Sequence, residues 1–368
     1  MPKTAVWNTE ISYFLNTGTK GERFMCNIAG YVGEREAAPI LIEMIRRQEG
    51  LNGGFFTGIS THDGEKIDYR KVEGDLDALL SHTDAARLSG RTGMIHSRTP
   101  SGGNWLWSHP FVTVCEGSVK MSYVANGGIG AFKERNASYN VIADRLIAEG
   151  IDIPCKIAFE GDKYNRLSTG EAVHMSDVMC QLIYEKKKMG RNTVDAMTEA
   201  FCEMPSEIVG LVIEETFSDR IYFSRINQPM FVGFGKDGAY LASTPMAFPE
   251  EISEYSLLPA LSSGIVYKDR YEAVSYDGFS MEVAAFDDHT LEQAEREVLA
   301  LLSEGEAGMK DVFAAVKKIL PADKITQSAA IGYCAMTKLL RSGKIRPRAS
   351  QRTVRGSVAP YTLFCLTH

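Results

Sequence analysis

The chain has 368 residues, of which 44% are apolar and 24% are charged, and its formal net charge is −7 at pH 7. Its seven cysteines are odd in number and scattered, which argues against a disulfide framework and favours a reducing cytoplasm. No apolar run approaches the length of a membrane span, so we expect a cytoplasmic protein without a membrane partner. At this length we expect two domains, or one large domain with a smaller appendage.

The charges are unevenly distributed, and the change predicts a domain boundary. Acidic residues end at Asp323, whereas eight Lys or Arg residues follow it. The chain before residue 324 therefore has a net charge of −15, and the two parts are expected to present different electrostatic surfaces. We predict a leader or pro-segment at 1–25, a large domain at 26–285 and a small basic domain at 290–368.

The first chemical signal is a single cysteine at the end of the predicted leader. Residues 1–25 are polar and lack the apolar centre of a signal peptide, and Met25 is an alternative start. Cys26 then opens an apolar run, Cys26–Gly33, which has the length of a buried strand. If the chain is cut before Cys26, that residue carries a thiol and a free α-amine, a nucleophile and its own general base. The alternative interpretation is a small buried hydrophobic residue.

The predicted elements that follow both alternate with and cluster apart from one another. Apolar residues on one helical face predict a helix at 37–47. Early strands are predicted at 55–60, at 66–72, from 93 into a glycine-rich loop that ends at 103, and in a pair that ends at 128. Helices are predicted at 138–148, 176–188 and 194–204, with an irregular insert at 151–171. Late strands are predicted at 207–213, 221–224, 230–234, 239–243 and 265–267. This pattern favours a layered α+β fold over a doubly wound sheet.

A formal GxGxxG match occurs at Gly233–Gly238. The dinucleotide-binding motif requires a helix after its glycines, but the next residues predict a strand, and 236–238 is typical of a hairpin turn. The histidines and cysteines show no metal-ligand spacing. We therefore predict no cofactor and no metal site.

Cleavage of the glutamine amide by a cysteine needs a thiolate, a base, donors for the developing oxyanion and groups that hold the charged ends of the substrate. The turn predicted at Asn126-Gly127 can aim a side-chain amide and a backbone N–H at one point. Arg98 offers a planar fork for a carboxylate, and Asp177 near a helix start is able to pair with an ammonium group. The structural alternatives are a hairpin turn, an ion-paired arginine and a helix cap.

Taken in order, five segments resemble motifs of the class II (N-terminal nucleophile) glutamine amidotransferases, most of all the glutaminase domain of glucosamine-fructose-6-phosphate aminotransferase. Cys26–Gly33 resembles the CGIxGYxG run that opens those mature chains, except at Asn27. Residues 95–103 resemble GHTRWATHG, and residues 107–110 resemble NAHP. Residues 125–129 resemble HNGIIxN, and residues 174–178 resemble SETDTEV. Their order and approximate spacing extend the resemblance over residues 26 to about 285.

The resemblance implies a role for each matching residue. It makes Cys26 the nucleophile, and it makes Asn126 and Gly127 the oxyanion donors. It assigns Arg98 to the α-carboxylate of glutamine and Asp177 to the α-ammonium group. Ser101, in the glycine-rich loop after Arg98, is assigned to substrate binding as well.

Three departures from the family pattern border the expected glutamine pocket. Asn52 stands where YRGYDSAG has an arginine, Thr99 stands where the family has tryptophan, and Gly102 replaces a histidine. These changes leave the identity of the amide substrate open. The mechanism also needs Cys26 to become the first residue, through removal of 1–25 or through a start at Met25 followed by methionine removal.

The remaining 80 or so residues are too few for the sugar-phosphate isomerase or phosphoribosyltransferase modules of the family. The ammonia acceptor is then a partner synthase subunit, or water. Helical faces within 291–302, 312–319 and 331–339 precede a hairpin of 344–348 with 358–366, whose basic tip is 349–356. This arrangement is similar to a winged helix. Docking to a partner protein or to a second copy is favoured over nucleic-acid binding through phosphate contacts.

We therefore predict a four-layer αββα N-terminal-nucleophile hydrolase sandwich, followed by a small helical winged-helix-like domain. The predicted activity is hydrolysis of the glutamine side-chain amide, which releases glutamate and ammonia. Two alternatives stay open: a non-catalytic amidotransferase-like protein that binds an amino acid or a partner, and an amidohydrolase of the same fold that acts on another amide. In the first alternative, Thr99 and Phe55 fill the glutamine pocket. The sequence leaves the assembly state, including a homo-oligomer, open.

Overall fold

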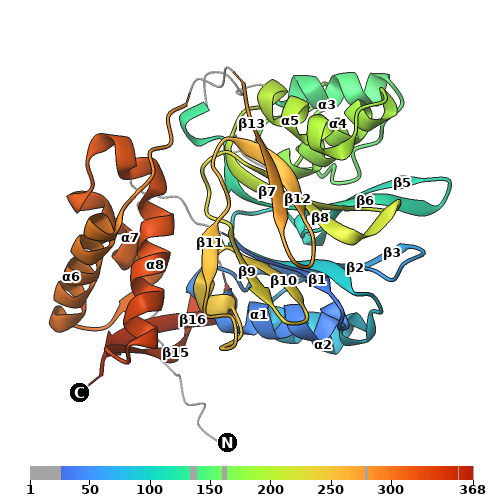
Figure 1. The fold of residues 1–368 in the computed structure, drawn as a ribbon. Coiled ribbons are helices and arrows are strands. Elements are labelled where there is room, and N and C mark those ends of the chain that lie inside the picture. Colours follow the sequence, from blue (N-terminus) through green and yellow to red (C-terminus); the bar gives the residue numbers. More distant parts are fainter. Residues whose placement is uncertain (1–25, 133–138, 160–163, 278–280, 355, 368) are drawn as a thin grey trace, which may run out of the picture.

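The computed structural model describes residues 26–132, 139–159, 164–277, 281–354 and 356–367. The predicted leader at 1–25 lies outside these residues. Two sheets pack face to face between layers of helices, and a further helical part lies beside them (Figure 1). Within the described ranges, none of the helices combines the length and the apolar character needed to cross a membrane.

The first sheet has seven strands in the order β11-β9-β10-β1-β4-β2-β3. Its strands are β1 (Asn27–Gly33), β2 (Phe56–His62), β3 (Ile67–Glu73), β4 (Thr92–Arg98), β9 (Phe231–Gly235), β10 (Gly238–Ala242) and β11 (Tyr255–Leu257). The central strand β1 pairs with β10 on one side and with β4 on the other, both antiparallel. Because β1 and β4 are neighbours, the residue before β1 lies close to the residues that follow β4.

The second sheet has six strands in the order β13-β12-β8-β7-β6-β5. Its strands are β5 (Phe111–Cys115), β6 (Ser118–Gly128), β7 (Glu207–Glu214), β8 (Phe217–Arg225), β12 (Ser262–Val266) and β13 (Tyr271–Ser275). The sequence prediction of a hairpin turn at Asn126-Gly127 is wrong. Both residues continue the β6 ladder, where Asn126 is opposite Val209 of β7.

Alternation of side chains along β1 explains the layering. Ile28 and Val32 face the second sheet and pack with residues such as Leu211, whereas Ala29 and Tyr31 face the helices. The outer face of the first sheet is covered by α1 (Ala37–Asn52) and α2 (Leu76–His82), and that of the second by α3 (Tyr139–Ala148), α4 (Met175–Lys188) and α5 (Thr193–Glu203). The described part of the chain from β1 to β13 therefore forms the predicted αββα arrangement.

The C-terminal part consists of three helices and a small sheet. The elements are α6 (Asp288–Glu304), β14 (Ala307–Gly308), α7 (Met309–Ile319), α8 (Ser328–Arg341), β15 (Ile345–Val354) and β16 (Ser357–Leu366). The sheet order is β14-β16-β15. The predicted hairpin is present, but pairing continues to Val354 opposite Ser357, so residues 349–354, including Arg352, lie in a strand and not at a looped tip.

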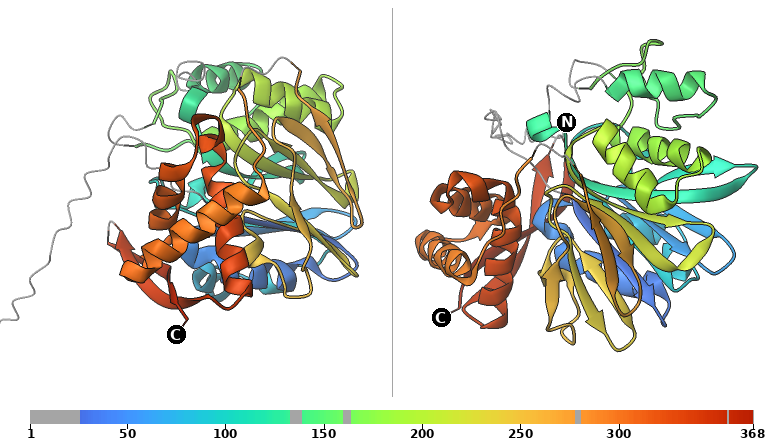
Figure 2. Two further views of the ribbon diagram at one scale, coloured as in Figure 1. Left: turned by 60° about the vertical axis from the view of Figure 1, so that its left-hand side comes forward. Right: turned by 45° about the horizontal axis from the view of Figure 1, so that its top comes forward.

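The C-terminal part packs against the side of the sandwich that carries α1. Buried residues of α6, α7 and α8 share one apolar cluster with residues of α1, such as Leu41 and Met44. Strand β16 contacts both α1 and α6, and Figure 2 shows the hairpin between the C-terminal helices and the sandwich. Five 3₁₀ turns among the described residues complete the fold: Ala85–Arg87, Trp105–Trp107, Gly130–Phe132, Pro245–Ala247 and Ala322–Gln327.

Candidate active site

Cys26 lies where three strand ends meet. Its backbone nitrogen donates a hydrogen bond to Asn126 Oδ1 at 2.8 Å, and its sulfur lies 3.8 Å from Thr99 Oγ1. Burial raises the pKa of the Cys26 thiol, while the Thr99 backbone and the Arg98 guanidinium oppose that rise. The side chain is therefore held among polar groups, and not packed in an aliphatic core.

Asn126 presents an unused donor at this point. Its side chain is 1% exposed, and Nδ2 has no hydrogen-bond partner among the described residues. The bond from Cys26 to Oδ1 fixes which end of the amide is free. A buried amide N–H without a partner carries a desolvation cost that a substrate oxygen would remove.

Gly127 follows Asn126 with φ at +133°, a conformation that side-chain-bearing residues rarely adopt. A Cβ at this position would lie 2.1 Å from the Glu207 carbonyl oxygen. Only glycine therefore fits at this point of the β6–β7 ladder. The sequence prediction associated the Asn-Gly pair with a turn, but the glycine instead permits close approach of β7 directly after Asn126.

Arg98, at the end of β4, is 1% exposed and has no carboxylate partner among the described residues. Its Nη1 donates to the Gly102 carbonyl at 2.9 Å, whereas Nη2 has no partner in the described part of the chain. Its guanidinium carbon lies over the Phe56 ring at 4.9 Å and over the Trp107 ring at 5.9 Å. Burial lowers the pKa of Arg98, and the nearby Tyr164 hydroxyl and Cys26 thiol oppose that shift. Among the described residues Arg98 therefore forms no ion pair, and one of its buried N–H groups is left without an acceptor.

Asp177 lies in the first turn of α4, and it is 1% exposed. It does not cap that helix, because the His174 side chain takes the capping bond from the Ser176 N–H. Its carboxylate accepts hydrogen bonds from the Cys155 backbone N–H and from Gln181 Nε2, each at 3.0 Å. Burial raises the pKa of Asp177, and these bonds oppose that rise.

One indole ring connects the two groups predicted to hold the substrate. Trp107 Nε1 donates to the Cys155 carbonyl at 2.7 Å, and the Cys155 N–H donates to Asp177. The same Trp107 ring lies beside the Arg98 guanidinium. The structure thus brings Arg98 and Asp177 into one region, from β4 and α4.

Ser101 lies in the loop after β4, partly buried. Its N–H donates to the Thr99 carbonyl at 2.8 Å, and its carbonyl accepts a hydrogen bond from the Tyr164 hydroxyl. The loop is therefore tied to the 151–171 insert close to Arg98. Sequence reasoning did not identify Tyr164, because the irregular insert at 151–171 shows no pattern that would indicate a functional residue.

Two histidines in this region stay uncharged. His96 and His109 stack with ring centroids 3.9 Å apart, and the His174 ring lies 5.6 Å from that of His109. Burial lowers the pKa of His96 to about 3 and that of His109 well below its usual range. Neither histidine was assigned a role from sequence, and a neutral pair adds no charge that would compete with Arg98 for an anion.

Phe55 lies against the C-terminal hairpin. It packs with Phe56, Ala359 and Val354 of the C-terminal hairpin, and the Arg352 guanidinium lies 5.2 Å from its ring. Its backbone N–H donates to the Arg98 carbonyl at 3.2 Å. Thr99, which the non-catalytic alternative places in the glutamine pocket together with Phe55, lies beside the nucleophile, with its Oγ1 3.8 Å from the Cys26 sulfur.

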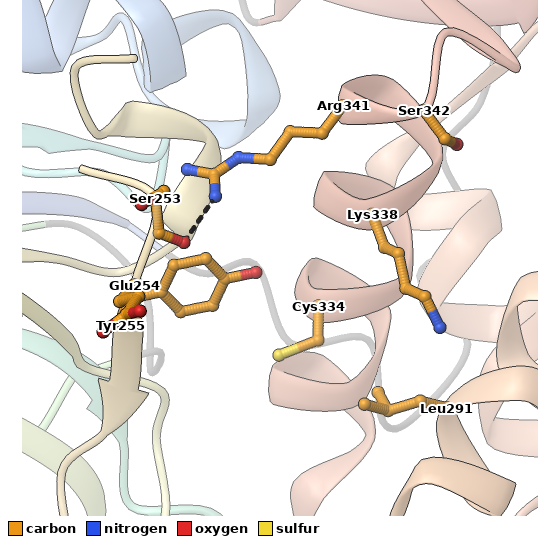
Figure 3. Close-up of a pocket in the computed structure, with 8 residues that line it drawn as sticks. All are labelled: Ser253, Glu254, Tyr255, Leu291, Cys334, Lys338, Arg341 and Ser342. Atoms are coloured by element: carbon orange, nitrogen blue, oxygen red, sulfur yellow. Dashed lines mark hydrogen bonds between the residues drawn. The ribbon is translucent and has the colours of Figure 1, made fainter. Parts of the chain in front are cut away.

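A groove of about 630 Å³ lies elsewhere, between α8 and β11 (Figure 3). Its cations are already engaged, since Arg341 donates to the carbonyls of Ser253 and Ile252 and Lys338 pairs with Glu295. Its lining residues are Ser253, Glu254, Tyr255, Leu291, Cys334, Lys338, Arg341 and Ser342. Burial raises the pKa of the Cys334 thiol to about 12, which makes it a poor nucleophile. No predicted site residue lines this groove. Among the described residues, no group of three or more His, Cys, Asp or Glu could hold a metal ion.

Comparison with known proteins identifies relatives of the N-terminal part. No protein-family model matches the chain. Glutamine–fructose-6-phosphate aminotransferase of Thermococcus kodakarensis is 27% identical over 278 residues, which are 74% of this chain and 41% of that protein. The enzyme of the same name from Pyrococcus horikoshii is 28% identical over 247 residues, 67% of this chain and 37% of that protein. The chain thus spans only 37–41% of the length of these relatives.

Solved structures agree at the level of the fold. Glutamine phosphoribosylpyrophosphate amidotransferase from B. subtilis, complexed with ADP and GMP, gives a TM-score of 0.55 at 16% identity, over 85% of this chain and 64% of that chain. The allosteric regulatory enzyme of purine biosynthesis gives the same TM-score and identity, over 84% of this chain and 63% of that chain. Over its N-terminal part the chain is therefore similar in sequence to glutamine–fructose-6-phosphate aminotransferases, and it shares the fold of glutamine phosphoribosylpyrophosphate amidotransferase.

Proposed function

We propose that this chain is an enzyme that hydrolyses the side-chain amide of glutamine with Cys26 as the nucleophile. The products are glutamate and ammonia, and the ammonia passes to an acceptor on another subunit. The observation that carries the proposal is the 2.8 Å bond from the Cys26 nitrogen to Asn126 Oδ1, which joins the candidate nucleophile to the candidate oxyanion donor. The names of the relatives support the same reaction.

The proposed reaction proceeds through a thioester. With Cys26 as the first residue, its α-amine takes the thiol proton as the sulfur attacks the amide carbon. Asn126 Nδ2 and the Gly127 N–H stabilise the oxyanion of the tetrahedral intermediate. The C–N bond then breaks as the α-ammonium group protonates the leaving nitrogen, which departs as ammonia. Water hydrolyses the γ-glutamyl thioester with the amine again as base, and glutamate leaves.

The charged end of glutamine is proposed to lie between Arg98 and Asp177. The free Nη2 of Arg98 supports binding of the α-carboxylate, because a carboxylate oxygen would satisfy it. Asp177 is proposed to accept from the α-ammonium group, in addition to its bonds with Cys155 and Gln181. Ser101, in the loop tied to Tyr164, is proposed to line the same pocket.

The base in this mechanism exists only after processing. While residues 1–25 are attached, the nitrogen of Cys26 is an amide and cannot take a proton. We infer that activity requires removal of 1–25, or a start at Met25 followed by methionine removal. A cytoplasmic location stays a prediction.

A second candidate is hydrolysis of another amide by the same residues. Thr99 Oγ1 lies 3.8 Å from the Cys26 sulfur, where the family has a tryptophan next to the binding arginine. A small hydroxyl-bearing residue at that point supports a pocket of different shape from that of the relatives. A panel of γ-glutamyl and acyl amides separates the two candidates.

For the C-terminal part we infer a small domain at 290–368 with a winged-helix-like order of elements. The succession α6-β14-α7-α8-β15-β16 supports this inference. Docking to a partner protein or a second copy is favoured over nucleic-acid binding, because two of its arginines are engaged. Arg348 pairs with Glu306, and Arg352 bonds to the backbone of α1; Arg355 lies outside the described residues. Salt-sensitive DNA or RNA binding by the purified chain, lost in Arg346→Glu, would instead favour nucleic acid.

The test is release of ammonia and glutamate in equal amounts from glutamine by chain that mass spectrometry shows to begin at Cys26. Cys26→Ala is expected to abolish both products. Equal release by chain that retains residues 1–25 would contradict the proposed base. Absence of release from every amide in the panel would leave the non-catalytic alternative.

A further inference from the structure

We propose that Arg352 and Tyr333, two residues of the C-terminal part, are positioning residues that hold the segment Asn52–Phe55 against the end of β4, at Ser97 and Arg98. The proposal rests on the amide hydrolysis assigned above to Cys26. It makes the C-terminal part a component of the site and not an independent attachment. Residues 52 and 352 are 300 residues apart in sequence, yet the structure brings them into contact.

The inner side of the segment lies against the strand ends that carry the site. The Gly54 N–H donates to Ser97 Oγ at 2.8 Å, and the Phe55 N–H donates to the Arg98 carbonyl at 3.2 Å. A Cβ on Gly53 would lie 2.5 Å from Ser97 Oγ and 3.0 Å from Asn27 Oδ1. A larger residue at position 53 would force either Ser97 or the segment to shift, so the segment is closely packed against the strands that lead to Cys26 and Arg98.

The outer side of the segment is held by Arg352 of β15. Its Nη2 donates to the carbonyls of Asn52 at 2.6 Å and Gly53 at 2.9 Å. Its guanidinium lies between two rings, 5.2 Å from that of Phe55 and 5.3 Å from that of Tyr361. These carbonyls belong to the last residue of α1 and to the residue after it, where backbone acceptors lack partners within the helix and a cation is favourable. Helix α1 has no basic residue in its own last turn, so the C-terminal hairpin supplies that charge.

Tyr333 of α8 holds the side chain at the start of the segment. It is 0% exposed, and its hydroxyl oxygen accepts a hydrogen bond from Asn52 Nδ2 at 3.3 Å. Burial raises the pKa of Tyr333, and the Cys26 thiol acts in the same direction. The contact that ties this phenol to the segment is the hydrogen bond with Asn52. Asn52 is also the residue that departs from the arginine of the family motif.

Close packing shows that the hairpin and the segment fit each other. Gly54 has φ at +94°, and a Cβ there would lie 3.0 Å from both Ala359 Cβ and Pro360 Cδ of β16. A Cβ on Gly50 would lie 2.4 Å from Thr362 Oγ1. Glycines of α1 and of the segment thus admit β16 at backbone distance, beside α1 as Figure 1 shows. The hairpin therefore packs closely against both the segment and the end of α1.

The contacts predict separable effects. The segment bonds to the Arg98 carbonyl and leads to Phe56, whose ring lies under the Arg98 guanidinium. Release of Arg352 is therefore expected to weaken the grip on the α-carboxylate, which raises KM for glutamine more than it lowers kcat. Release of the segment from Ser97 and Arg98 is also expected to open access to the neighbouring Cys26 sulfur, and the rate of alkylation measures that access without any substrate.

The experiment compares Arg352→Met and Tyr333→Phe with Arg346→Met, in the full chain that begins at Cys26. Arg346 is the matched control, because it lies on the same strand and its side chain is exposed. Arg352→Met is expected to raise KM for glutamine about tenfold, the loss typical of hydrogen bonds from a charged group. It is also expected to speed iodoacetamide alkylation of Cys26 about threefold or more. Arg352→Lys is expected to recover part of both, and Arg346→Met to change neither.

Tyr333→Phe removes one oxygen from a buried ring, so the packing of α8 is retained. It is expected to speed Cys26 alkylation by a smaller factor than Arg352→Met. If both variants keep the wild-type KM and the wild-type alkylation rate, whatever their melting temperatures, the two residues serve stability alone and the proposal is overturned. If the wild-type chain releases no ammonia, the proposed function fails, while the alkylation rates still decide whether the two residues hold the site.

Discussion

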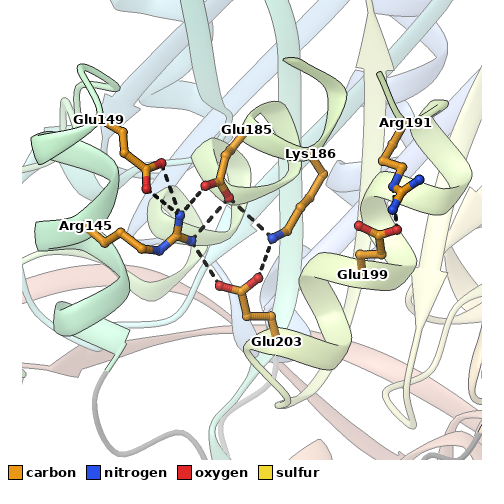
Figure 4. A network of polar contacts seen from close by, with 7 residues as sticks. All are labelled: Arg145, Glu149, Glu185, Lys186, Arg191, Glu199 and Glu203. Atoms are coloured by element: carbon orange, nitrogen blue, oxygen red, sulfur yellow. Dashed lines mark hydrogen bonds and ion pairs between the residues drawn. The ribbon is translucent and has the colours of Figure 1, made fainter. Parts of the chain in front are cut away.

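Two arginine-containing regions of the sandwich, one partly exposed around Arg145 and one buried around Arg98, show how a structural network differs from a candidate site. On the helical layer, Arg145 of α3 donates to Glu149 at 3.1 Å and to Glu203 at 3.0 Å, and it also bonds to Glu185 (Figure 4). Lys186 completes that network through Glu185 and Glu203. The Glu185 carboxylate raises the pKa of Arg145, whereas burial without a carboxylate lowers that of Arg98.

The two regions differ in whether their polar atoms have hydrogen-bond partners within the protein. The network around Arg145 satisfies its charges with groups of the protein itself. Around Cys26, by contrast, Asn126 Nδ2 and Arg98 Nη2 have no partner among the described residues. Unmet polar groups in a buried region cost stability, so they indicate a region arranged for a ligand. Substitutions at the two regions should therefore act on different measurements.

The largest effect is expected at the oxyanion donor. Asn126→Asp keeps the shape and the acceptor for the Cys26 nitrogen, but it replaces the N–H donor with an oxygen. We expect kcat for amide hydrolysis to fall by about 10²–10³, the usual loss for one oxyanion donor. Steady-state ammonia release measures the fall, and a kcat within threefold of wild type would contradict the role of Nδ2.

Arg98→Met is expected to lower kcat/KM for glutamine by about 10², mostly through KM, because a charge-assisted fork to the carboxylate is lost. Since Arg98 is buried without a carboxylate partner among the described residues, the melting temperature should stay equal or rise. A large loss of stability with unchanged KM would make Arg98 a structural residue instead.

A third comparison uses Glu49, a buried carboxyl of α1. It accepts a hydrogen bond from Ser97, the residue that also bonds to the segment Asn52–Phe55. Ser97 Oγ, the Leu76 N–H and Thr57 Oγ1 all donate to its Oε1, at 2.8, 2.9 and 3.3 Å. Burial raises the pKa of Glu49 to about 7, from an unperturbed 4.5. The folded state therefore binds the Glu49 proton more tightly than the unfolded state does. Protonated Glu49 thus favours the folded state at low pH, and this contribution to the free energy of unfolding is lost as the pH rises from about 4.5 through 7.

Glu49→Gln keeps the acceptor oxygen but does not ionise. Above pH 7 we expect this variant to be more stable than the wild type by up to about 3 kcal/mol, with the difference vanishing below about pH 4.5. Urea unfolding at pH 4.5 and pH 8 measures it, with the exposed Glu251→Gln as control. An equal difference at both pH values would show that Glu49 does not titrate in this window.

The smallest effect is expected at Arg145. Arg145→Met is predicted to lower the free energy of unfolding by about 1 kcal/mol, since its network is partly solvent-exposed. Ammonia release should be unchanged. Added salt should narrow the difference in stability between wild type and variant. Loss of ammonia release without loss of stability would show that Arg145 belongs to the site as Arg98 does, and would contradict the comparison.

The sandwich was predictable because its strands alternate and its motifs keep their order. Ile28 and Val32 on one face of β1, and Ala29 and Tyr31 on the other, already imply two layers. The C-terminal end of α1 was not predictable, and the predicted helix stopped at residue 47. The helix continues to Asn52 with buried polar residues that an apolar pattern cannot reveal, such as Gln48, which donates to the Ile28 carbonyl.

The site was predictable in part. The motif order placed Cys26 next to Asn126, but the Asn-Gly pair was misassigned to a turn, since its β7 partner is about 80 residues away in the chain. Arg352 lies in a basic stretch that suggested an exposed tip. Its contact with Asn52 depends on how the C-terminal hairpin packs on α1, and short-range sequence patterns carry no record of that packing.

The most direct test of the account is the position at which an electrophilic glutamine analogue attaches to the chain. We predict one adduct, on the sulfur of Cys26, in a protein whose first residue is Cys26, and protection by excess glutamine. Attachment to another cysteine such as the exposed Cys202, or ammonia release that persists in Cys26→Ala, would contradict the central claim.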